Sequence, residues 1–137
     1  EIGCLMMDCH IGRAIKEGKI EEHISMSAQG TEELLKASNI DKDTKGNILK
    51  CVLEHHGSRS FYSLESEICC NADCYRFASI KGFTMAIRYM RDVPFEELIG
   101  LLGKKVEEKI HTVTIKSCRN ELTPQYKTIQ EFLRCLK

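Results

Sequence analysis

The residues best suited to chemistry are histidines and aspartates in the first half of the chain. Asp8 and Asp73 lie there, together with four of the five histidines: His10, His23, His55 and His56. Imidazole nitrogens and carboxylate oxygens are the usual protein ligands of Zn, Fe, Mn and related ions. Residues 1–80 carry 9 basic and 13 acidic residues, so this half is also net negative. The residue types therefore predict a divalent cation site in the first half.

Two features sharpen this prediction. His55 and His56 are adjacent, and successive helical residues point about 100° apart, so we expect one to reach a site while the other flanks it near the helix end. Asp73 lies among small and apolar residues in an expected helix, where a buried carboxylate needs a cation or several donors. The simpler alternative is an ion pair with Arg76, three residues later. With histidines upstream, we favour a shared cation.

The elements that must position these residues are helices. The chain contains two prolines and no run of alternating polar and β-branched residues long enough for a sheet. We expect Gly12 and Gly18 to bracket a polar connection, Gly57 to end a helix and Gly82 to break one. Ser63 is expected to be an N-cap residue, and Pro94 is expected in a first helical turn. The predicted fold class is all-α, with helices over residues 1–10, 21–38, 44–56, 63–80, 83–91, 94–118 and from 123 to the C-terminus.

Length and composition exclude several classes of protein. The 137 residues predict one domain, and 42% hydrophobic with 29% charged residues is an ordinary globular balance. The net charge is zero, and residues 81–137 are only modestly basic, so no nucleic-acid duplex is expected as a partner. There is no apolar run of about 18 residues, so no membrane partner is expected.

Eight cysteines are a high count for this length, yet no CxxC spacing occurs. Without that spacing, neither a zinc ribbon nor a thioredoxin-like site is indicated. We interpret the cysteines as reduced thiols that pack as small apolar residues. Because the chain opens directly into helical sequence and its thiols suit a reducing compartment, we expect a cytoplasmic protein.

The ordered motifs resemble a known family. His55-His56-Gly57, then residues 64–68, then Asn71-Ala72-Asp73 resemble the C-terminal part of a metal-dependent phosphohydrolase of the HD superfamily. Ile11-Gly12-Arg13 resembles the segment after the family's His-Asp pair, and Glu22-His23 resembles an additional histidine found in some branches. The resemblance covers residues 4–80. Residues 81–137 have no counterpart and are expected to form a helical extension of a single domain, 1–137.

The resemblance implies a helical bundle of the HD type, with a mono- or dinuclear metal centre that hydrolyses phosphate esters. Asp73 and Arg13 match catalytic positions, and Arg13 and Arg59 are the candidate phosphate contacts. The implied substrate is a nucleotide or another small phosphate ester, and a homo-oligomer is left open. Zn, Fe, Mn, Ni and Mg are not distinguished. The implied metal ligands are His10, His23, His55, His56 and Asp73.

Two departures from the family pattern stand out. The family's earliest histidine ligand has no counterpart, because the chain starts too late to contain it. With Ile11-Gly12 in register, the His-Asp pair falls on Cys9 and His10. Asp8 is then one residue early and, on a helix, points about 200° away from His10. We therefore expect a single ion held by histidine and Asp73, with Asp8 dispensable.

Three functions fit these observations. The first is a metal-dependent phosphohydrolase, which the paired histidines and Asp73 favour. The second is a degenerate HD-type domain that binds or regulates without turnover, which the altered pair favours. The third is a plain helical interaction module, in which the histidines cap a helix and Asp73 pairs with Arg76.

Overall fold

The computed structural model describes residues 1–136, and the regular structure among them is entirely helical. The predicted all-α helical bundle is therefore confirmed. The described chain divides into two compact units, Glu1–Cys70 and Asn71–Lys137, and the boundary lies inside helix α5 (Leu64–Ala78). This boundary falls about ten residues earlier than the expected end of the metal-site helices at residue 80.

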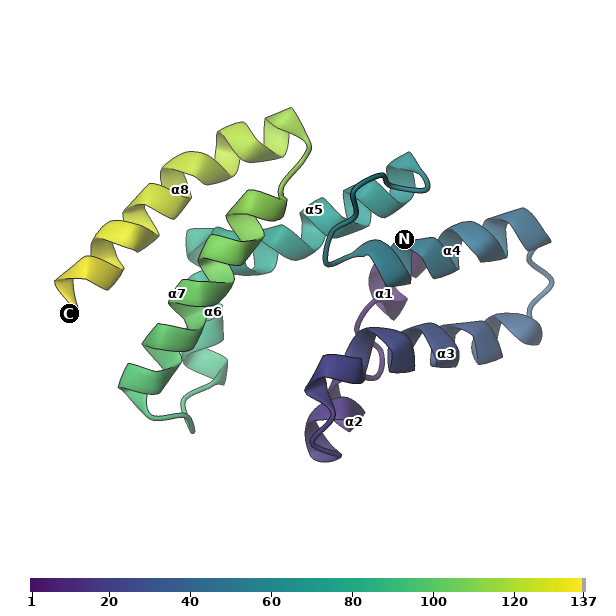
Figure 1. The fold of residues 1–137 in the computed structure, drawn as a ribbon, viewed down its shortest axis with the longest axis horizontal. Helices are drawn as coiled ribbons and strands as arrows, with labels where there is room; N and C mark the ends of the chain where they lie inside the picture. Colours follow the sequence, from purple (N-terminus) through teal and green to yellow (C-terminus); the bar gives the residue numbers. More distant parts are fainter. Residues whose placement is uncertain (137) are drawn as a thin grey trace. The chain divides into compact units, whose positions relative to one another are not determined.

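The first unit is built around two neighbouring helices, α3 (His23–Lys36) and α4 (Lys42–Glu54), which pack against each other (Figure 1). Their short connection makes them antiparallel, so the start of α3 lies beside the end of α4. The shorter helix α1 contacts α4, and α2 contacts α3. The other elements of this unit are α1 (Ile2–Met6), α2 (Ile11–Lys16), the 3-10 helix η1 (Ile20–Glu22) and the first half of α5.

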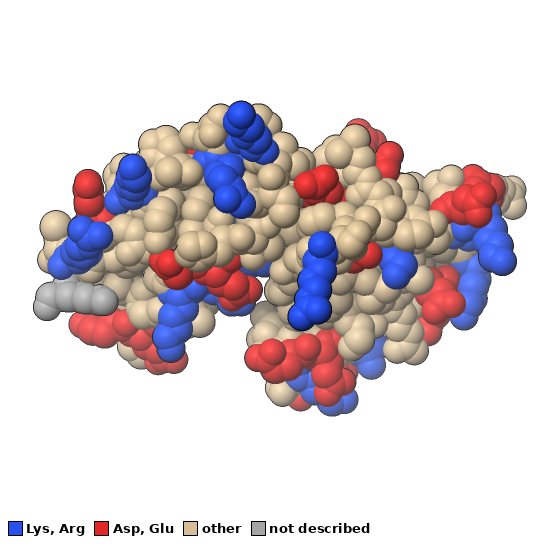
Figure 2. All heavy atoms as spheres, turned by 45° about the horizontal axis from the view of Figure 1, so that its top comes forward, with Lys and Arg blue, Asp and Glu red and all other residues tan. Residues whose placement is uncertain are grey.

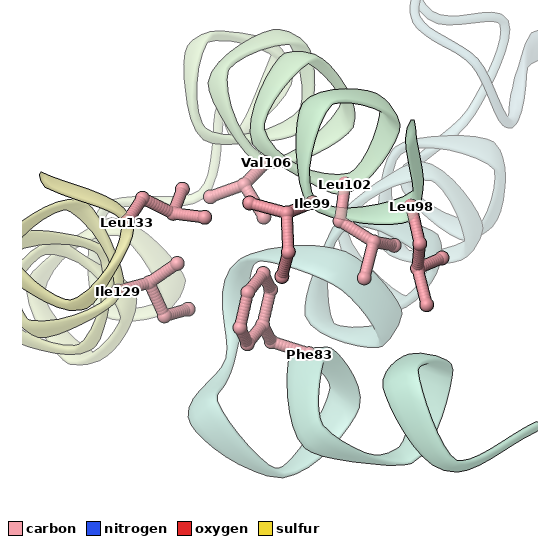
Figure 3. Close-up of a cluster of buried hydrophobic side chains, with 7 residues drawn as sticks. All are labelled: Phe83, Leu98, Ile99, Leu102, Val106, Ile129 and Leu133. Atoms are coloured by element: carbon pink, nitrogen blue, oxygen red, sulfur yellow. The ribbon is translucent and has the colours of Figure 1, made fainter. Parts of the chain in front are cut away.

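The second unit has its own hydrophobic core, shown in Figure 3. Phe83 of α6 packs between apolar stripes of α7 and α8, whose members recur at helical spacing. The helices are α6 (Ile80–Tyr89), α7 (Phe95–Thr112) and α8 (Lys116–Cys135), together with the end of α5. The remaining cluster residues are Leu98, Ile99, Leu102, Val106, Ile129 and Leu133.

A buried ion pair also lies in this second unit. Asp73 of α5 is fully buried, and its Oδ2 lies 2.6 Å from Nζ of Lys109, which is only 1% exposed. Arg76 approaches the other oxygen, with Nη2 at 2.7 Å from Oδ1. Both carboxylate oxygens of Asp73 are therefore held by cations from α5 and α7.

Several helix ends differ from those predicted. Residues 11–16 form α2 instead of a polar connection, and Gly18 ends it with a positive φ of 69°. The break before α6 is at Ser79, whose hydroxyl caps the N–H of Gly82, so Gly82 lies inside α6. In the last third of the chain, α7 ends at Thr112 and α8 already begins at Lys116. Pro124 then lies within α8 instead of starting a helix.

The surface carries both signs of charge. On the face shown in Figure 2, lysine and arginine side chains are interspersed with aspartate and glutamate, without one broad basic area. Among the described helices, none combines the length and apolar character needed to span a bilayer.

Candidate metal centre

Three histidines converge in the first unit. His23 is the first residue of α3, and His55 and His56 directly follow the last residue of α4. One ligand atom from each of the three lies within 4.8 Å of the others. His55 and His56 are the first two residues after α4, and the centroids of their rings lie 4.4 Å apart. Of the residues predicted to converge, the structure brings these three histidines together, without Asp73.

The two buried imidazoles are fixed by backbone hydrogen bonds. Nδ1–H of His23 donates to the carbonyl oxygen of Ile20 at 2.6 Å, and Nδ1–H of His55 donates to that of Val52 at 2.7 Å. A carbonyl oxygen only accepts, so the proton of each neutral ring is on Nδ1 and Nε2 presents a lone pair. A hydrogen bond from the other ring nitrogen to a backbone carbonyl is what orients histidine ligands in metal sites.

Asp8 is the carboxylate of the site. Its Oδ1 lies 3.4 Å from Nε2 of His55 and 3.8 Å from Nε2 of His23. His55 is fully buried, and its Nε2 makes no hydrogen bond to any described residue. An ionised carboxylate and a neutral Nε2 are both acceptors, so a positive charge between them, a proton or a metal ion, is required.

The donor set fits a divalent metal. Metal–nitrogen bonds of about 2.0–2.1 Å place two ligands no more than about 4.2 Å apart. The observed upper separation of 4.8 Å is therefore closed by a shift of roughly half an ångström. Imidazole nitrogens with one carboxylate suit Zn, Fe, Mn and Ni better than Mg or Ca, which prefer all-oxygen sets.

The position of Asp8 corrects the register predicted from sequence. Helix α1 ends at Met6 and α2 begins at Ile11, so residues 7–10 form a turn, with the N–H of Ile11 bonded to the carbonyl of Asp8. The expectation that Asp8 points away assumed a continuous helix through His10. In a turn that rotation does not apply, and Asp8 faces the histidines.

Asp73 requires the opposite correction. It was expected as a metal ligand and catalytic residue, but it is not a member of the described histidine group. Its oxygens are bonded to Lys109 and Arg76 within the second unit. A carboxylate already neutralised by two cations has no need of a metal, so the simpler alternative of an Arg76 pair is what the structure shows, with Lys109 added.

His10 also differs from expectation. Its backbone N–H is bonded to the hydroxyl of Ser27 at 3.2 Å, and its Nδ1 lies 3.3 Å from Sγ of Cys9. The ring covers Gly30 of α3 so closely that a Cβ there would lie 2.0 Å from Cε1. His10 is therefore a packing residue between the turn and α3, and it is not part of the histidine group.

The two candidate phosphate contacts are exposed. Arg13, on α2, forms a salt bridge with Glu17 one turn later, with Nε 2.7 Å from Oε1. This bond raises the pKa of Arg13 and lowers that of Glu17. Arg59 lies exposed in the loop that follows His56 and Gly57. Of the two, Arg59 is close in the chain to a metal-ligand candidate, and Arg13 is engaged elsewhere.

Comparison of the chain with protein families, with curated proteins and with solved structures found no match.

Proposed function

We propose that the protein is a metal-dependent phosphohydrolase of the HD type, acting on a nucleotide or another small phosphate ester. The observation that carries this proposal is the pair of buried imidazoles, fixed through Nδ1, whose Nε2 atoms face the carboxylate of Asp8. His23, His55 and His56 with Asp8 would hold the ion. The resemblance of the surrounding motifs to the HD superfamily supplies the reaction class.

Each residue of the site has a distinct task in this proposal. A bound divalent ion supplies an activated water and neutralises phosphoryl oxygens. The carbonyls of Ile20 and Val52 keep both Nε2 atoms directed at the ion, and Asp8 provides the negative charge that offsets it. Arg59 is the arginine best placed in the chain to bind an anionic group, since a guanidinium pairs bidentately with phosphate.

A second candidate function is binding without turnover, in a degenerate domain of the same type. It is favoured by the engagement of Asp73 with Lys109 and Arg76, which leaves Asp8 as the carboxylate seen beside His23 and His55 among the described residues. One carboxylate does not readily bridge two ions and also orient a water.

We favour the cytoplasm as the compartment, because none of the eight cysteines within residues 1–136 forms a disulfide.

Metal content and turnover distinguish these candidates. Purified protein is reconstituted separately with Mn, Fe, Ni or Zn, and metal per chain is measured by elemental analysis. The same samples are assayed with a chromogenic phosphodiester and phosphomonoester. We expect about one ion per chain, with turnover that His55→Gln abolishes. Metal without turnover supports the binding domain, and absence of metal overturns both candidates.

A further inference from the structure

A second cluster of reactive side chains, made of three cysteines, lies in the first unit. Sγ of Cys4 on α1 lies 3.0 Å from Sγ of Cys69 on α5. Cys51 of α4 lies beside them, since a Cβ added to Gly3 would be 2.4 Å from Cβ of Cys51 and 3.4 Å from Sγ of Cys69. Three helices therefore bring three thiols together around a buried glycine.

The three thiols differ in exposure. Cys51 and Cys69 are both only 4% exposed, whereas Cys4 is half-buried and accessible from solvent. Burial raises the pKa of Cys69, and its neighbours Cys4 and Cys51 raise it further. Burial likewise raises the pKa of Cys51. Cys4 is thus the member that an oxidant meets first, and Cys69 is its protonated partner.

We propose that Cys4 and Cys69 form a reversible redox pair that hydrogen peroxide oxidises to a disulfide. The Cys4 thiolate attacks one oxygen of the peroxide, the O–O bond breaks, and Cys4 becomes a sulfenic acid as hydroxide leaves. The Cys69 sulfur then attacks Sγ of Cys4, an S–S bond forms, and the S–O bond breaks. The departing hydroxide takes the Cys69 proton, so two thiols and one peroxide give one disulfide and two waters.

The geometry favours this pair over others. The two sulfurs are about 1 Å farther apart than the 2.05 Å of a disulfide bond, so a small approach completes it. Glycine at position 3 leaves room for this approach, because a larger residue there would press on Cys51. The bond would link α1 to α5 and close a long loop, which restricts the unfolded chain.

Two of the three thiols are also close in the chain to residues of the candidate metal centre. Cys4 precedes Asp8 by four residues, and Cys51 precedes His55 by four residues on α4. A disulfide at Cys4 therefore fixes the helix that leads into the Asp8 turn. We expect oxidation to change metal affinity. That effect rests on the proposed function, whereas the thiol chemistry does not.

Peptide mapping of the full chain tests the proposal. Reduced protein is treated with equimolar hydrogen peroxide, remaining thiols are alkylated, and tryptic peptides are analysed by mass spectrometry. We expect a fall from eight to six alkylated cysteines. We also expect a cross-linked species, two hydrogens lighter than the separate peptides, that joins residues 1–13 to residues 60–76. Dithiothreitol should restore both peptides.

Matched variants assign the sulfurs. Cys9 shares a tryptic peptide with Cys4, so Cys9→Ser should retain the cross-link while Cys4→Ser loses it. Fragment ions between Cys69 and Cys70 identify the partner, and Cys69→Ala provides a second test. A cross-link through residues 51–59, a cross-link that survives Cys4→Ser, or sulfinic acid at Cys4 without a cross-link would each overturn the proposal. Protection of Cys4 that only a chelator removes would instead indicate a metal–thiolate site.

Discussion

At the scale of single residues, the site depends on which nitrogen of each imidazole carries the proton. The carbonyls of Ile20 and Val52 settle this by accepting from Nδ1 of His23 and His55. Asp8 then faces two lone pairs instead of two N–H groups. Without a proton or a metal ion between them, the carboxylate of Asp8 and the Nε2 atoms of His23 and His55 are three acceptors that face one another in a buried place, which is unfavourable.

Asp8→Asn should therefore weaken metal binding at least about tenfold, since removal of supporting or direct ligands commonly costs 10–100-fold. Asn keeps the shape of the side chain but not its charge. Isothermal titration with Zn or Ni measures the affinity, and Asp43→Asn, an exposed carboxylate in the first turn of α4, is the matched control. Equal affinities in the two variants would exclude Asp8 from the site.

A prediction for alkaline pH follows from the buried thiols. Burial raises the pKa of Cys51 and Cys69, so the folded chain retains protons that the unfolded chain releases near the ordinary thiol pKa of about 8.5. Their contribution to stability is fully present below that pH and is lost above it. The free energy of unfolding should fall by up to about 1.4 kcal/mol per pH unit for each thiol.

Urea denaturation under reducing conditions at pH 7.5, 8.5 and 9.5 measures this slope. The double variant Cys51→Ala with Cys69→Ala should show a smaller loss than the wild type over the same interval. Identical slopes would show that these thiols ionise in the folded state as easily as in the unfolded one.

At the scale of elements, helix ends depend on contacts that local sequence does not contain. Gly82 lies inside α6, at a point where α6 comes close to the end of α5. A Cβ at this position would be 2.2 Å from the carbonyl oxygen of Arg76, so only glycine permits this approach. Gly100, in the middle of α7, has no such neighbour within 4 Å. The same residue type thus has opposite roles in two helices of one unit.

Gly82→Ala should consequently destabilise the protein by roughly 1–3 kcal/mol through overpacking against the backbone of α5. Gly100→Ala should stabilise it by about 0.5–1 kcal/mol, because alanine loses less backbone entropy in a helix. Chemical denaturation of both variants beside the wild type gives the two values. Effects of the same sign would contradict the packing described for Gly82.

Sequence patterns predicted features that periodicity, capping or motif order encode, and missed those set by long-range packing. The all-α class, the Ser63 cap on Ser66 and the meeting of His23, His55 and His56 follow from periodicity, capping and motif order. Pro124 was expected to start a helix, but Leu122 before it and Ile129 after it are both buried, and that packing offsets the lost hydrogen bond.

From the sequence, Asp73 was expected beside the histidines and Asp8 away from them, and the structure shows the reverse for Asp8. The reason is again that long-range contacts are not visible in local sequence. The end of α1 at Met6 carries no glycine or proline signal, so the turn that directs Asp8 inward was not visible in the sequence. Lys109, the partner of Asp73, is separated from it by 36 residues in a segment without a family counterpart. A long-range ion pair of this kind has no local signature.

At the scale of the whole molecule, the chain keeps its two most polar interior features in separate units. The histidine site belongs to residues 1–70, and the Asp73–Lys109 pair belongs to residues 71–137. We propose that the first receives a cation, whereas the second contains its own cation, Lys109. The two features should respond independently to substitution.

Asp73→Asn should lower the free energy of unfolding by about 3–5 kcal/mol, because it leaves the buried ammonium of Lys109 without a counter-charge. Metal per folded chain should be unchanged, which reverses the expectation drawn from sequence alone. Denaturation curves and elemental analysis on the same preparation test both statements. Loss of metal from a folded Asp73→Asn protein would return Asp73 to the site.

The burial of Lys109 also makes its reactivity toward amine reagents a measure of how often the second unit opens. An amine-reactive acylating reagent needs a deprotonated, accessible nitrogen, and the ammonium of Lys109 is neither while it is bonded to Asp73 inside the protein. Exposed Lys104, five residues earlier on the same helix, should acylate freely in the native state. The ratio of label on these two side chains therefore measures how often the second unit opens, without any engineered substitution.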